Sequence, residues 1–277
     1  MFDIAGLVGA LTLEPTGQDR YRAANVDAGH GVIFGGQLLA QSVIAGLAGE
    51  AGKAVKTVHT IFARSGSPEA PVDITVERMH SGRAMASCTV TISQGERLCA
   101  RSQVLLSADE PDFIRHADAA PVTPGSRESR STGEASRAWE VRIAGDADIS
   151  DPGRTGPPDL DVWTRFVGAP HDPGVSQALL AFATDGFLIG TAMRPHEGVG
   201  QAQAHVTLST GVLSHTLTFH EPLYAGDWLL LAHHSTYAGH GRSYGTANVF
   251  LEDGSLVASF VQDAMIRPMK DGNAGKL

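Results

Sequence analysis

The chain has few cysteines, no cluster of positive charge and no long uninterrupted apolar run. Its 277 residues contain only two cysteines, Cys88 and Cys99, which is typical of a reduced cytoplasmic protein without a disulfide framework. A formal net charge of -9 without a basic stripe argues against a nucleic-acid partner, because phosphate neutralisation needs clustered Lys and Arg. No uninterrupted apolar stretch is long enough to cross a bilayer, and no basic residue precedes the first apolar run as in a signal peptide. We therefore expect a soluble cytoplasmic protein without a membrane partner.

Two chemical motifs are incomplete. His233-His234 and His196-Glu197 lack metal-ligand spacing such as H-E-x-x-H, so we expect neither a metal ion nor another cofactor. Residues 241–245 fit G-x-S-x-G, centred on Ser243. A nucleophile elbow needs a helix directly after the serine and a base histidine later in the chain. Strand-like residues follow Ser243 instead, and no histidine does, so we interpret the match as accidental.

The chain repeats one plan twice. Residues 31–49 and 175–193 have helical spacing of apolar residues, and each segment is followed by four strand-like runs: 58–63, 71–80, 83–93 and 97–107 in the first half, 213–219, 227–236, 244–252 and 255–266 in the second. The repeats match His59 with His215 and Gln103 with Gln262. Two further runs, 139–145 and 161–168, are expected to begin the second copy as strands.

This organisation predicts an α+β protein of two domains, 1–111 and 137–277, joined by a Pro-, Ser- and Gly-rich linker over 112–136. The second helix is apolar nearly all round from 178 to 193, which places it inside a core. A helix can be buried on most sides when an antiparallel sheet curves around it. That arrangement is the hotdog fold, and we expect a tandem double hotdog.

Five motifs carry a resemblance to a known family: FGGQLLAQS at 34–42, VHTIFARSG at 58–66, LLAFATDGFL at 179–188, SHTLTFHEPLYAGDWLL at 214–230 and DGSLVASFVQDAMIR at 253–267. Together they resemble the type II acyl-CoA thioesterases. The resemblance implies a double hotdog, a role in fatty acid metabolism, and hydrolysis of fatty acyl-CoA to free acid and coenzyme A. Coenzyme A is then part of the substrate rather than a cofactor. A homodimer or homotetramer is also implied.

Members of that family use an Asp, a Thr or Ser, and a Gln to position and activate water. By resemblance the Gln falls on Gln262 and the hydroxyl on Ser235 or Thr236. The Asp falls directly before a histidine, where this chain has Ser214. A hydroxyl has almost no basicity near neutral pH, so the loss of a carboxylate is expected to lower the rate about 10²–10⁴-fold unless another group substitutes.

Asp185 is the candidate substitute, because it is the sole charge between Val175 and Arg194 in a helix predicted to be buried. Burial raises the pKa of an unpaired carboxyl toward the range useful for a general base. The alternative is a structural role, in which Asp185 caps a break at Gly186 or pairs with backbone N–H groups of the other half. Gln262 lies on an otherwise apolar strand face, where an amide needs hydrogen-bond partners. It could orient water and the thioester carbonyl, or it could bridge two backbone groups at a domain interface. Glycines around His30 could aim backbone N–H groups at a thioester oxygen, or could simply form a turn.

The sequence therefore predicts an acyl-CoA thioesterase acting through activated water. Ser214 motivates a second hypothesis, a catalytically weak or silent acyl-CoA-binding protein. A third, an enoyl-thioester hydratase on the same fold, is disfavoured because the pattern D-x-N-P-x-H is absent.

Overall fold

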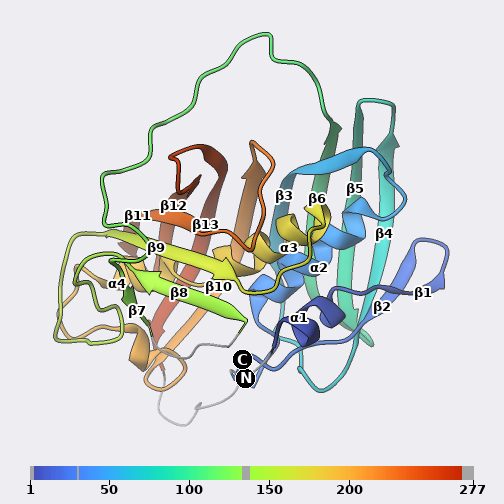
Figure 1. The fold of residues 1–277 in the computed structure, drawn as a ribbon. Coiled ribbons are helices and arrows are strands. Elements are labelled where there is room, and N and C mark those ends of the chain that lie inside the picture. Colours follow the sequence, from blue (N-terminus) through green and yellow to red (C-terminus); the bar gives the residue numbers. More distant parts are fainter. Residues whose placement is uncertain (1–2, 30, 133–137, 270–277) are drawn as a thin grey trace.

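The computed structural model describes residues 3–29, 31–132 and 138–269. All of its strands join one antiparallel sheet of 13 strands in the order β1-β2-β4-β5-β6-β3-β10-β13-β12-β11-β9-β8-β7. The sheet curves around two long helices (Figure 1). Strands β3 and β10, one from each half of the chain, pair at the centre of the sheet. The predicted plan of a helix wrapped by a curved antiparallel sheet is thus present twice, with the two sheets joined edge to edge.

The first half contains two elements that the sequence pattern did not indicate, the short helix α1 and the β1–β2 hairpin. Its elements are α1 (Ile4–Ala10), β1 (Glu14–Gly17), β2 (Arg20–Ala23), α2 (Gly35–Leu47), β3 (Lys53–Phe62), β4 (Val72–Ser81), β5 (Met85–Gln94) and β6 (Arg97–Ala108). The expected central helix and its four strands are all there. The turn between β5 and β6 begins at Gly95, whose φ of 57° suits glycine.

The second half has the same plan with additional elements at its outer edge. Its elements are β7 (Arg130–Ser131), β8 (Trp139–Ile143), β9 (Asp159–Phe166), α3 (Pro173–Thr184), α4 (Leu188–Met193), η1 (Gln201–Gln203), β10 (Leu208–Phe219), β11 (Leu229–Gly239), β12 (Arg242–Leu251) and β13 (Leu256–Pro268). The two strands expected to begin this copy are β8 and β9. The expected single helix is two helices, because the chain leaves α3 at Asp185 and re-enters a helix at Leu188.

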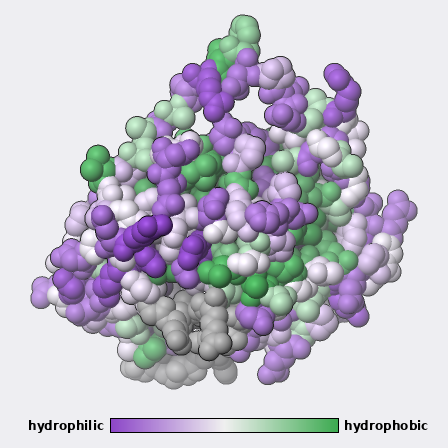
Figure 2. Space-filling model, viewed as in Figure 1, coloured by the Kyte–Doolittle hydropathy of each residue, from purple (hydrophilic) through white to green (hydrophobic). Residues whose placement is uncertain are grey.

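The core lies between the helices and the concave face of the sheet. Helices α2 and α3 run antiparallel against each other, and α3 is buried along nearly its whole length. Within the described residues, 173–193 is long and apolar enough to cross a membrane, but 83% of its most apolar window is buried inside the protein. On the face shown in Figure 2, hydrophobic residues gather toward the middle and right, and the left is mostly hydrophilic.

The described part of the predicted linker covers the outer face of the second half. Trp163 Nε1 donates to the Pro124 carbonyl over 2.9 Å, and Arg142 Nη1 donates to the Ser126 carbonyl over 2.8 Å. Beneath this segment Trp163, Trp228, Leu230 and Phe250 form a separate apolar cluster. The linker therefore shields a second, smaller core. The remainder of the predicted linker, 133–136, lies outside the described residues.

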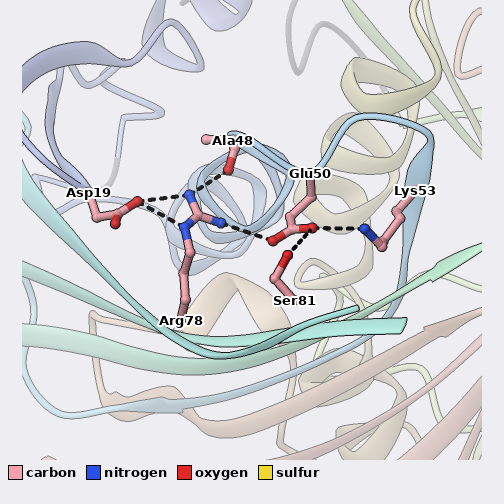
Figure 3. A network of polar contacts seen from close by, with 6 residues as sticks. All are labelled: Asp19, Ala48, Glu50, Lys53, Arg78 and Ser81. Atoms are coloured by element: carbon pink, nitrogen blue, oxygen red, sulfur yellow. Dashed lines mark hydrogen bonds and ion pairs between the residues drawn. The ribbon is translucent and has the colours of Figure 1, made fainter. Parts of the chain in front are cut away.

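An ion network around the buried Glu50 side chain fixes the C-terminal end of α2 (Figure 3). Arg78 donates to the Ala48 carbonyl over 2.7 Å and to Asp19 over 2.8 Å. Glu50 accepts from Arg78 over 3.3 Å and from Lys53 over 2.9 Å. The hydrogen bond from Lys53 is the main cause that lowers the pKa of Glu50. The network ties the β1–β2 turn, α2, β3 and β4 together at one end of the helix.

Candidate active site

The site forms where the start of α2 meets the end of α3. A Cβ atom on Gly36 would lie 2.3 Å from the Phe182 carbonyl oxygen, and one on Gly35 would lie 2.7 Å from Asp185 Oδ2. Real Cβ atoms do not approach other atoms so closely, so only glycine allows the two helix ends to touch here. The Gly35-Gly36 pair therefore brings the N-terminus of α2, with its partial positive charge, against the Asp185 carboxyl group.

Asp185 is the C-cap residue of α3 and is 9% exposed. Burial raises the pKa of its carboxyl group to about 7, and a hydrogen bond from the Gly36 backbone partly opposes that shift. At neutral pH a substantial share of the carboxyl groups is ionised and able to accept a proton. A general base works best when its pKa lies near the working pH, and Asp185 meets that condition.

Gln262 on β13 faces Asp185. Its Nε2 lies 3.3 Å from Asp185 Oδ1 and 3.3 Å from His215 Nδ1. His215 Nε2 in turn lies 3.1 Å from Thr184 Oγ1, the residue directly before Asp185. The Gln262 carbonyl oxygen Oε1 is buried and has no hydrogen-bond partner among the described residues. The site thus combines one carboxyl group, which can accept a proton from water when ionised, with one free amide oxygen, which can accept a hydrogen bond from water.

A row of residues on the concave face leads across the sheet to this point. In the strand ladders Ser235 pairs with Gly245, Gly245 with Gln262, Gln262 with His215, and His215 with Thr60. All five residues are buried. Gly245 leaves room for its neighbours, since a Cβ atom there would lie 2.7 Å from Leu188 Cδ2.

The two predicted hydroxyl residues take different positions in β11. Ser235 faces inward, 8% exposed, and its Oγ lies 3.5 Å from the Tyr244 carbonyl oxygen. Thr236 is exposed and lies where the β11–β12 register shifts. The structure shows no contact of either with Gln262, although Ser235 is two strands away in the same row. The hydroxyl that does reach the Gln262–His215 pair belongs to Thr184, which sequence reasoning missed.

Ser214 lies on the opposite face of the sheet from His215. Its Oγ donates to Asp263 Oδ2 over 3.0 Å, at the convex surface. A side chain at this position points away from Gln262 and Asp185. The presence of serine here therefore removes nothing from the site on the concave face.

The equivalent place in the first copy lacks this chemistry. His59 pairs with Gln103 in the ladder, as expected from the repeat, but Gln103 is exposed and Thr60 and Ser102 point inward instead. The side-chain period of a strand is two, so a one-residue offset places the matching pair on the other face. Thr60 Oγ1 and Ser102 Oγ bond each other over 2.7 Å.

At the other junction of the helices, the start of α3 meets the end of α2. There Gly174 approaches Leu47, and Gln177 exchanges hydrogen bonds with both backbone groups of Val55. Neither contact supplies a carboxylate. The acid at this junction, Asp172, is exposed and caps the start of α3 by accepting from the Val175 N–H, whereas Asp185 at the other junction is buried.

The remaining sequence candidates give little chemistry. Ser243 lies within strand β12, where its ladder partners are Ala238 and Ala264, and the next described element is strand β13 rather than a helix. No group of three His, Cys, Asp or Glu side chains suited to a metal ion occurs among the residues that the structure describes. His30 lies outside the described residues.

Comparison with known proteins places both halves in one family. Residues 23–107 match the model of the acyl-CoA thioesterase N-terminal domain, and residues 114–266 match that of the C-terminal domain. The chain is 26% identical to acyl-CoA thioesterase 2 of Haemophilus influenzae, over 94% of this chain and 96% of that one. Among solved structures, an acyl-CoA thioesterase II of Mycobacterium marinum is 26% identical with a TM-score of 0.80, over 96% of this chain and 98% of that one. A protein from Alicyclobacillus acidocaldarius described as having a hot dog fold superposes with a TM-score of 0.76 at 15% identity, over 95% and 98% of the two chains. The expected tandem hotdog fold is thus confirmed.

Proposed function

Since the chain belongs to the type II acyl-CoA thioesterase family and hydrolyses acyl-CoA thioesters, we propose that Asp185 and Gln262 are the residues that activate the attacking water. The observation that carries this assignment is the contact between the two side chains at the start of α2, 3.3 Å from Gln262 Nε2 to Asp185 Oδ1. This contact joins Asp185, the sole charged residue between Val175 and Arg194, to Gln262, the amide that the sequence analysis identified on an apolar strand face.

In this mechanism the ionised Asp185 accepts a proton from water while the water oxygen bonds to the thioester carbonyl carbon. Gln262 Oε1 accepts the other proton of the water in a hydrogen bond and so fixes its orientation. The carbonyl electron pair moves onto oxygen, where the positive end of α2, which begins at Gly35, stabilises the developing negative charge. The carbonyl then re-forms, the C–S bond breaks, and Asp185 returns its proton to the sulfur of coenzyme A.

The electrostatics of the site support the base assignment. A carboxyl group with its usual pKa would be a weak base, whereas burial raises the pKa of Asp185 to about 7. His215 is a poorer candidate, because burial lowers its pKa to about 3 and its Nδ1 is occupied by Gln262. The reaction needs only water, Asp185, Gln262 and the helix end, so we propose that no metal or cofactor takes part.

The alternative of a silent acyl-CoA-binding protein was based on Ser214. Because Ser214 bonds Asp263 on the convex face, the argument for lost activity does not apply to the site built around Asp185. We also propose a cytoplasmic homodimer or homotetramer that acts in fatty acid metabolism. Exposed apolar side chains on the sheet, including Ile61 and Leu105, support self-association, and sedimentation velocity tests it.

The assignment is tested by release of free thiol from short, medium and long acyl-CoAs. We expect Asp185→Asn to lower kcat about 10²–10⁴-fold and Gln262→Ala on the order of 10²-fold. Asp263→Asn is the matched control, since it removes the neighbouring carboxylate on the other face, and we expect near wild-type turnover. Ser214→Ala should behave likewise. Wild-type turnover in Asp185→Asn, or loss of activity in both controls, would overturn the assignment.

A further inference from the structure

The hydrogen bonds around Thr184 define which nitrogen of His215 carries its proton. Thr184 Oγ1 donates its single proton to the Ala181 carbonyl over 2.9 Å. Its contact with His215 Nε2, 3.1 Å away, therefore requires the imidazole to be the donor. His215 is fully buried, and burial lowers its pKa to about 3, so the ring is neutral with its one proton on Nε2.

With the proton on Nε2, His215 Nδ1 can only accept. The group that it faces at 3.3 Å must then be the NH₂ of Gln262, not its carbonyl oxygen. The second N–H of that amide points to Asp185 Oδ1, also at 3.3 Å. Rotating the amide by half a turn would set its oxygen against two acceptors at once, the imidazole Nδ1 and the carboxylate.

We infer that Thr184 and His215 are positioning residues that fix the Gln262 amide with its NH₂ toward Asp185 and its Oε1 free to accept from the attacking water. The inference rests on the proposed function and extends it to two residues that act through Gln262. The chain of contacts, which we call the relay, runs from the Ala181 carbonyl through Thr184, His215 and Gln262 to Asp185.

The relay also affects the pH at which Asp185 ionises. A hydrogen bond from Gln262 stabilises the carboxylate form, so its loss raises the pKa of Asp185 further. The groups packed around Asp185 and His215 are uncharged: the Gly36 backbone on α2, Gln262 on β13, and His233 beyond the Phe260 ring. His59 on β3 lowers the pKa of His215 from the convex side of the sheet.

The paired variants Thr184→Val and Thr184→Ser test the relay. Valine keeps the shape and removes the acceptor for His215, whereas serine keeps it. We expect Thr184→Val to lower kcat about 10-fold with little change in KM, and to move the acid limb of the kcat/KM profile toward higher pH. Thr184→Ser should retain the wild-type profile. Equal profiles for the two variants would overturn the relay.

A measurement on the wild-type protein avoids any folding defect of a variant. Nitrogen-15 spectra of the His215 ring distinguish the two neutral tautomers, and we expect a protonated Nε2 and an unprotonated Nδ1 at pH 7. A proton on Nδ1 would refute the relay. The two proposals fail separately: an active Asp185→Asn refutes the proposed base, whereas an inactive Asp185→Asn with a wild-type Thr184→Val profile refutes the relay alone.

Discussion

Asp185→Asn is expected to make the folded protein more stable at alkaline pH while it removes activity. Burial raises the pKa of Asp185 from its ordinary 3.8 to about 7 in the folded state. Between these values the folded protein holds a proton that the unfolded chain has released. Stability therefore falls as pH rises from about 4 to about 7, and above pH 7 the folded state carries the full cost of a buried carboxylate.

The size of the effect follows from that shift. The difference between 3.8 and about 7, at about 1.4 kcal/mol per pH unit, sets a ceiling of roughly 4 kcal/mol. The asparagine must turn its NH₂ toward one of two donors, the Gly36 N–H or the Gln262 amide, which subtracts about 1–2 kcal/mol. We expect a net gain of about 2 kcal/mol in the free energy of unfolding at pH 8 and no gain at pH 4.

Urea unfolding of wild type, Asp185→Asn and Asp263→Asn at pH 4 and pH 8 measures this difference. The exposed Asp263 is the control for a general change in charge, and its variant should show no pH-dependent gain. If Asp185→Asn were no more stable than wild type at pH 8, the buried carboxylate would not destabilise the folded state. A gain of equal size at both pH values would also contradict the argument, because it would not depend on ionisation.

Three other substitutions test the contact between the two helix ends, a second buried histidine and the ion network around Glu50. Gly36→Ala should separate α2 from α3, lower the activity, and lower the free energy of unfolding by about 1–3 kcal/mol. Gly9→Ala is the control, because a Cβ atom there would meet open space. Thermal unfolding and thiol release should both be unchanged in that variant. His233→Phe should reduce the loss of stability on acidification. Burial lowers the pKa of His233 to about 4, so below about pH 6.5 the unfolded chain binds a proton that the folded protein does not. An unchanged slope of stability between pH 6.5 and 4 would refute that role. Arg78→Met should destabilise the fold by roughly 1–3 kcal/mol, because Glu50 loses one of its two cationic partners. The kcat should not change, since the network lies at the far end of α2 from Asp185. An unaltered unfolding midpoint would mean that the network adds no stability.

The fold was predictable because its signals are local and repeated. Alternating apolar residues marked the long strands, and the all-apolar character of the second helix marked its burial. The helix break at Asp185 was harder to place, since Gly186 and Phe187 do not by themselves end a helix. The β1–β2 hairpin was missed because its strands are four residues each and mostly exposed.

The site was only partly predictable, because the face of a strand on which a residue lies depends on its register. Gln262 stood out as an amide on an apolar face. Ser214 was a misleading candidate: the β10–β13 register shifts between Val212 and Ser214, and the ladder then turns His215 inward and Ser214 outward. Thr184 meets His215 only through tertiary pairing of residues 31 positions apart, for which the sequence offers no local signal.

The pH dependence of kcat/KM for acyl-CoA hydrolysis tests the central claim most directly, since this quantity reports the ionisation of the free enzyme. If the base is the buried Asp185, activity should rise with pH through an acid limb centred at about 7. An acid limb near 4, the range of an ordinary exposed carboxylate, or a profile that is flat across neutral pH, would contradict it.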